Sequence, residues 1–309
     1  MAKRKIFIKT IGLLLLVTGL LSLFLVFAEF TSFYAFSEGS KFHYDGFGFG
    51  SLMFAFIVSN VMAYFTIAAS CIPLGIGNLA LKKWGLNLSL AFLRTILIIG
   101  ATIIISFLFS FDLIKILEPY QTLIILAFLL IFSIGLPFVL VKFYLNPKSE
   151  RLFENSDFDN YFEKQSPEKL TIILLNFFWI LVFYLLIFLK GAFPVFSKFI
   201  FNKEGVYLLS TASFTLIVLT YLFYKNKYYA KFASVAYYIV IFFTFGATFL
   251  KYTTKDFLNL LNLPAYEMEK VVPAFWLPAG INLGFFFGIL IIIQIFLICK
   301  TKIDSYKNG

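Results

Sequence analysis

Residues 142–169 read KFYLNPKSERLFENSDFDNYFEKQSPEK and form a long polar interval in a chain of 309 residues. We call this interval the polar linker. A block of strongly apolar sequence lies on each side of it, and each block divides into four apolar runs. Several runs reach the roughly 20 residues that a helix needs to cross the hydrocarbon core of a membrane. The sequence therefore predicts an all-α, polytopic transmembrane helical bundle of about eight spans, four on each side of the linker.

The composition agrees with a membrane protein. The chain is 61% hydrophobic and 14% charged, whereas a soluble domain is about half apolar and about a quarter charged. The apolar runs are continuous and do not alternate, which excludes a transmembrane β-barrel. The net charge of +10 comes from short basic clusters between the runs, a pattern typical of topology signals. We expect the lipid bilayer as the main partner and no nucleic acid.

The uncharged runs give the expected spans. The first, Thr10–Ala28, has 19 residues, longer than the apolar region of about 7–15 residues in a signal peptide. We expect an uncleaved span there, with a signal peptide cut after Ala28 as the alternative, and a loop from Glu29 to Gly50. The later spans are expected from Ser51 to about Gly77, then at Leu86–Phe111, Pro119–Val141, Leu170–Leu189, Val206–Tyr224, Phe232–Leu250 and Pro273–Cys299.

Local signals divide the chain into residues 1–141, the linker 142–169 and residues 170–309. Pro73 and Pro137 predict a kink or a helix end, because proline removes a backbone donor. Ser166-Pro167-Glu168 predicts a helix start, with a hydroxyl cap, proline in the first turn and an acid beside it. Ser156–Phe162 and Asp256–Leu263 predict two short helices on the membrane surface.

Basic residues predict the orientation. With the N-terminus in the cytoplasm, the cytoplasmic segments of an eight-span chain carry 17 Lys and Arg residues and the outer segments carry 8. Cytoplasmic loops are enriched in these residues, so both termini are expected inside, in the cytoplasmic (inner) membrane. The four-and-four arrangement would make the halves parallel, as in some transporters. Two explanations of this parallel arrangement remain open. One is an internal duplication, and the other is that the rules for loop charge alone produce it.

Part of the first half carries a resemblance. The Gly-rich helix end Pro73–Gly77, the turn Leu81-Lys82-Lys83-Trp84, and the span end Tyr144–Lys148 followed by Phe153 resemble a loose set of uncharacterised bacterial multi-pass membrane proteins. The resemblance covers about Ile72–Phe153 and implies no activity. In that pattern Arg or Lys follows the Trp, whereas here Gly85 follows it.

Five polar residues within the expected spans form a candidate intramembrane polar site. Arg94 is the charged one, and ionisable groups at membrane depth are often functional. It can also be an anchor whose charge reaches the interface. Amide side chains can line a solute path or hydrogen-bond across helices. The set is Asn60, Arg94, Asn176, Asn282 and Gln294.

The last span carries a glycine motif. Gly280, Gly284 and Gly288 form GxxxGxxxG, and small residues at this spacing let two helix backbones approach closely. We interpret the motif as a packing surface. Its partner is expected to be another span of this chain, a second copy, or a different membrane protein.

The chemical motifs restrict the possible functions. His43 is the only histidine, which excludes a multi-histidine metal site or bis-histidine haem made by this chain alone, and no cofactor is expected. The sequence contains no HExxH, no Walker motif and no Cys–His pair. A non-catalytic accessory or assembly protein is the first hypothesis. A small-solute transporter or channel and a lipid-acting enzyme using Arg94 are the alternatives.

Overall fold

The computed structural model describes residues 2–110, 117–154, 165–271 and 282–301. These residues are almost entirely helical, and a two-stranded hairpin is the sheet found among them. The elements, in chain order, are α1 Ala2–Phe36, α2 Leu52–Leu79, α3 Lys83–Leu108, α5 Pro119–Leu129, η1 Leu130–Gly135, α6 Leu136–Tyr144, α7 Pro147–Glu150, α8 Pro167–Phe188, β1 Phe193–Val195, β2 Lys198–Ile200, α9 Asn202–Tyr224, α10 Tyr228–Ile241, η2 Phe242–Gly246, α11 Ala247–Lys251, α12 Thr254–Leu260, η3 Glu267–Val271 and α14 Leu283–Lys300.

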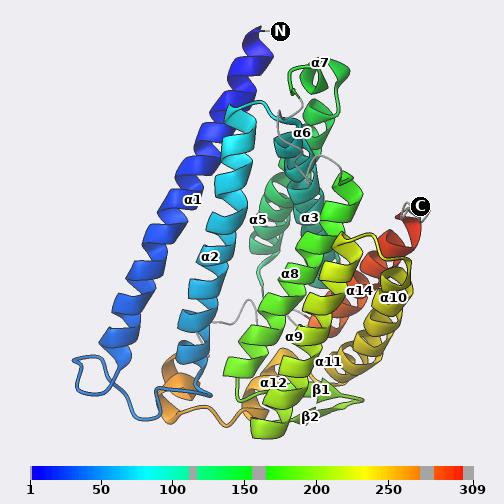
Figure 1. Ribbon diagram of the computed structural model, residues 1–309. Coiled ribbons are helices and arrows are strands. Elements are labelled where there is room, and N and C mark those ends of the chain that lie inside the picture. Colours follow the sequence, from blue (N-terminus) through cyan, green and yellow to red (C-terminus); the bar gives the residue numbers. More distant parts are fainter. Residues whose placement is uncertain (1, 111–116, 155–164, 272–281, 302–309) are drawn as a thin grey trace.

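Eight helices in this part of the chain are long and apolar enough to cross a membrane, with α5–η1–α6 and α10–η2–α11 each counting as one span. The chain is a multi-pass helical bundle, as the sequence predicts. Figure 1 shows the N-terminus and α7 at one end of the bundle, and the β hairpin and α12 at the other. Helices α8, α9, α10 and α14 lie together, while α1 leans against α2 on the outside (Figure 1).

Helix α1 differs most from its expected bounds. It continues without interruption from Ala2 to Phe36, about 52 Å at 1.5 Å per residue. The expectation of a loop starting at Glu29 is therefore wrong, because Glu29 lies inside α1. A single carboxylate does not end a helix when the neighbouring residues favour the helical conformation. The Glu29 carboxylate also accepts a hydrogen bond from Asn60 of α2.

The ends of the polar linker also belong to helices. Helix α6 runs on to Tyr144, and α8 begins at Pro167. Ser166 caps α8 as expected, because its hydroxyl accepts the N–H of Lys169 at 3.3 Å. The surface helix expected at 156–162 lies outside the described residues. Helix α12 occupies most of the second expected surface helix.

Two of the spans contain a π-helical turn. In η1 the N–H of Leu136 bonds the carbonyl of Ile131, just before Pro137. Proline cannot donate to the carbonyl four residues before it and clashes with it, so a wider turn relieves the conflict. In η2 the hydroxyl of Thr244 bonds the carbonyls of Val240 and Ile241 at 3.0 and 3.1 Å. These bonds matter because lipid offers no partner to a backbone carbonyl.

The packing has a main core and two smaller ones. The main core surrounds the fully buried Trp179 of α8 and joins α8, α9, α10 and α14 with the start of α2. The two halves of the chain therefore share one core. A smaller core lies where α1, the α2–α3 turn and α6 meet. Helices α1 and α2 touch closely at Gly75, where an added Cβ would lie 2.8 Å from the carbonyl oxygen of Gly12.

Candidate functional site

Five polar side chains meet inside the main core, and we call them the polar network. Asn176 of α8 donates to the hydroxyl of Thr220 on α9 at 2.7 Å. The hydroxyl of Tyr238 on α10 donates to Asn176 Oδ1 at 2.7 Å. Gln294 Nε2 on α14 donates to Asn176 Oδ1 at 2.6 Å and to the Tyr238 hydroxyl at 2.7 Å. Trp179 Nε1 donates to Gln294 Oε1 at 3.0 Å. The network thus connects four helices.

The polar network is closed to solvent. Trp179, Tyr238 and Gln294 are 0% exposed, Asn176 is 2% exposed and Thr220 is 8% exposed. Asn176 lies about 14 Å along α8, near the middle of that span. The interhelical donors and acceptors of the network are directed at one another, so it stabilises the arrangement of helices. Interhelical hydrogen bonds of this kind contribute about 0.6 kcal/mol each in membrane proteins.

Asn60 does not join this network. Its Nδ2 donates to Glu29 Oε1 of α1 at 3.0 Å, in a half-buried position between α1 and α2. A carboxylate that was expected in a loop therefore lies within a helix long enough to span the membrane. Glu29 was missed because the helix continues past the apolar run that defined the first span.

Arg94 pairs with Glu168 in the first turn of α8. The side chains of Arg94 and Glu168 are 27% and 51% exposed. The pair therefore lies at the start of α8, while Arg94 itself stands near the middle of α3, and the anchor interpretation stays a prediction. The sequence offered no acid beside Arg94, because Glu168 is 74 residues away and reaches it only through the contact between α3 and α8.

Asn282 is a helix cap. Its side-chain oxygen accepts the N–H of Phe285 at 3.2 Å, and its own N–H bonds the hydroxyl of Ser110 at 2.9 Å. An N-cap satisfies backbone donors that the first turn leaves free. Of the five candidate residues, the structure therefore brings together Asn176 and Gln294, while Asn60, Arg94 and Asn282 lie apart.

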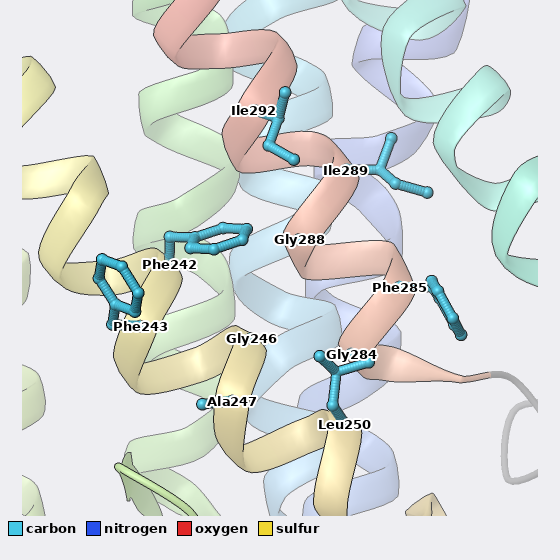
Figure 2. Close-up of a pocket in the computed structure, with 10 residues that line it drawn as sticks. All are labelled: Phe242, Phe243, Gly246, Ala247, Leu250, Gly284, Phe285, Gly288, Ile289 and Ile292. Atoms are coloured by element: carbon cyan, nitrogen blue, oxygen red, sulfur yellow. The ribbon is translucent and has the colours of Figure 1, made fainter.

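The glycines of the last span have different surroundings. A Cβ added at Gly284 would lie 2.6 Å from the backbone N of Leu250, so α14 packs tightly on α11 there. A Cβ at Gly288 would meet only Phe242, at 3.7 Å. Gly280 lies outside the described residues. Figure 2 shows Gly284 and Gly288 along a groove between α14 and the η2–α11 segment.

A second buried polar cluster lies in the first half. Asn78 Nδ2 of α2 donates to the hydroxyl of Ser89 on α3 at 2.8 Å, and the Tyr144 hydroxyl of α6 donates to Asn78 Oδ1 at 2.9 Å. All three residues are at most 4% exposed. The sequence does not point to this cluster, because Asn78 and Tyr144 stand at the ends of apolar runs, where polar residues are expected at the interface.

Glu267 caps α2 from the other half of the chain. Its carboxylate accepts the N–H groups of Leu52 and Met53 at 2.6 and 2.7 Å and the hydroxyl of Tyr44 at 2.7 Å. A negative charge is favourable at a helix N-terminus. Burial and the bond to Glu267 raise the pKa of the Tyr44 phenol above its ordinary value. No local sequence signal pointed to Glu267, since its partners lie more than 200 residues away.

The residues that the structure describes contain no group of three His, Cys, Asp or Glu side chains placed to hold a metal ion. Comparisons of the chain with protein-family models, with curated proteins and with solved structures find no match.

Proposed function

We propose that this chain is a non-catalytic accessory or assembly protein of the cytoplasmic (inner) membrane, acting through contacts with other membrane components. The observation that carries the proposal is the closed polar network. Asn176 and Gln294, the two candidate residues that meet near the middle of the bundle, bond one another and are at most 2% exposed. A solute path would need polar groups that face a water-filled cavity.

The apolar surface supports the same proposal. The best spanning window of Pro119–Tyr144 is 6% buried, whereas that of Pro167–Phe188 is 50% buried. The α5–η1–α6 span packs on α3 along one face and leaves the rest of its apolar surface exposed. Van der Waals packing against other helices is the main force of association within a membrane. This span is the best-placed surface for a partner helix, and a second copy of the chain is a possible partner.

The lipid-enzyme alternative is weaker because of the Arg94 contact. An enzyme that grips a lipid phosphate needs an available cation, and Glu168 already neutralises Arg94. The pair holds α3 against the start of α8. The transporter alternative has no comparable supporting contact in the part of the chain that the structure describes.

A photocrosslinking experiment tests the proposal. We would replace Phe132 of η1, which is 53% exposed, with benzoylphenylalanine in the full chain in its native membrane. Phe214 of α9, 68% exposed, is the matched control. We expect one discrete adduct from position 132, containing either a second membrane protein or a second copy, and none from position 214.

Two outcomes would contradict the proposal. Adducts of equal yield and variable mass at both positions would indicate random collision. The purified chain behaving as a monomer without adducts, while moving a solute across vesicles, would establish the transporter alternative.

A further inference from the structure

An apolar groove of about 300 Å³ lies on the surface of the bundle between α14 and the η2–α11 segment. Phe242, Gly246 and Leu250 form one wall, and Gly284, Gly288 and Ile292 form the other (Figure 2). The lining is carbon almost throughout. We call this feature the apolar groove.

Glycines on both walls create the groove. An added Cβ would meet nothing nearer than Phe242 at 4.0 Å for Gly246 and at 3.7 Å for Gly288. The close contact at Gly284 fixes the two helices at one end, and the space opens beyond it. The π-helical turn η2 adds to this arrangement, since such turns often occur at functional sites.

The groove is apolar along its length, so an occupant would contact mainly carbon atoms. A flexible hydrocarbon chain is thin enough to enter it, and an unfilled space would forfeit the dispersion contacts of its lining.

The depth of the groove fits one leaflet. Phe242 and Leu250 are eight residues apart, about 12 Å along a helix. Half of a hydrocarbon core of about 30 Å is about 15 Å. The groove thus extends from the end of α11, beside the β hairpin, toward the middle of the membrane.

A cation follows the groove-lining residue Leu250 directly in the chain. Lys251 is the last residue of α11 and follows Ala247 of the groove lining by one helical turn. Its side chain is exposed, and the ammonium lies 3.5 Å from the carbonyl oxygen of Ser197 and 5.4 Å from the ring centre of Tyr252. Lysine and tyrosine are typical of the headgroup level of a membrane, where a phosphate would be the complementary group.

We propose that the apolar groove binds one acyl chain of an anionic phospholipid from the leaflet on the β-hairpin side, with Lys251 facing the lipid phosphate. The lipid is a bound component of the protein rather than bulk solvent. This site is separate from the α5–η1–α6 surface, so either proposal can fail without the other.

The test uses the full chain in vesicles of phosphatidylcholine and phosphatidylglycerol. A phosphatidylglycerol probe carries a diazirine within one acyl chain, and labelled peptides are mapped by mass spectrometry. We expect labelling of residues 242–250 and 284–292 to exceed labelling of 207–218 of α9, which also carries exposed large apolar side chains, several-fold. Excess unlabelled phosphatidylglycerol should reduce the difference. Equal labelling of both regions would overturn the proposal.

Glycine variants give a matched control. Gly288→Leu fills the groove and should reduce its labelling to the level of the other lipid-facing helices. Gly135→Leu, in η1, introduces the same side chain at another π-helical turn, where the nearest atom is 3.4 Å from the added Cβ. It should leave the groove labelling unchanged. If Gly288→Leu does not fold, Gly246→Leu fills the opposite wall. Unchanged labelling in a folded groove-filling variant would refute the site.

The role of Lys251 is tested separately, through the lipid preference of the groove. Lys251→Gln should lower the preference of the groove for phosphatidylglycerol over phosphatidylcholine by about fivefold, since one lysine near an anionic surface contributes about 1 kcal/mol. Loss of all labelling together with crosslinks from the groove to residues 272–281, or to a second copy, would show that protein occupies the groove, and the proposal would be wrong.

Discussion

At the residue scale, Asn176 is the centre of the polar network, with hydrogen bonds to Thr220, Tyr238 and Gln294. Replacing it with leucine leaves buried partners without bonds. We expect Asn176→Leu to lower the free energy of unfolding by about 1–2 kcal/mol, since single interhelical bonds average about 0.6 and reach about 1.7. Unfolding in mixed micelles with increasing dodecyl sulfate measures the change.

Asn60→Leu is the matched control for that variant. Asn60 has one hydrogen bond to a side chain, that of Glu29, at a half-buried position. The loss of this hydrogen bond should lower the free energy of unfolding by less than the substitution at Asn176 does. Equal costs at the two positions would show that the network does not stabilise the bundle more than an isolated pair.

The buried position of Tyr44 leads us to predict that the free energy of unfolding depends on pH. The Tyr44 phenol is 8% exposed, and burial followed by the bond to Glu267 raises its pKa above the ordinary value of 10.0. A group whose pKa is higher in the folded state stabilises that state fully below its unfolded pKa. The contribution is lost as the pH rises from about 10 through the folded pKa, by up to about 1.4 kcal/mol per pH unit.

The variant Tyr44→Phe isolates this effect from other ionising groups. The difference in unfolding free energy between the two proteins should be constant below about pH 9 and should shrink above pH 10, because only the unsubstituted chain loses the contribution. Denaturant titrations in detergent at several pH values measure it. Parallel curves up to pH 11 would contradict the burial of the Tyr44 phenol beside Glu267.

At the element scale, the α1–α2 contact depends on glycine. A Cβ at Gly75 would lie 2.7 Å from the backbone N of Leu16 and 2.8 Å from the Gly12 oxygen. We expect Gly75→Ala to destabilise the protein by about 1–3 kcal/mol, the usual cost of overpacking, reduced by the better helix propensity of alanine. The unfolding midpoint in detergent should fall.

Gly288→Ala is the control because its Cβ would meet only Phe242, at 3.7 Å. The gain in helix propensity should appear there without a clash, so the midpoint should stay equal or rise. A fall of similar size in both variants would mean that any alanine weakens these helices, whatever its contacts.

The elements also show what a sequence pattern can and cannot predict. Length and hydropathy located the spans, because a run of apolar residues has few alternatives to a membrane helix. The same rule placed the end of α1 too early at Glu29. The π-helical turn η2 contains no proline that would predict it from the sequence. The carboxylate of Glu267 reaches α2 from another part of the fold. Such features depend on three-dimensional contacts that no local pattern encodes.

At the scale of the whole molecule, the sequence correctly predicted a multi-pass bundle, whereas of its five candidate polar residues the structure brings together Asn176 and Gln294. Amides alone do not reveal which helices are neighbours. Asn176 and Gln294 meet because α8 and α14 enclose one core, whereas Asn282 was only a cap at the start of α14. The parallel duplication of the two halves stays a prediction, since the shared core would form with or without it.

Orientation across the membrane is the last prediction, and it follows from charge. Lys198 in the β hairpin and Lys227 after α9 are both exposed and stand near opposite ends of a helix of 23 residues, about 34 Å long. The excess of Lys and Arg on the Lys227 side predicts that this side lies in the cytoplasm. Single Lys→Cys variants are made in a Cys299→Ser background with buried Cys71 retained. A membrane-impermeant maleimide should label position 198 in intact cells and position 227 only after permeabilisation. The reverse pattern would invert the orientation, and labelling of both positions from one side would contradict α9 as a membrane span.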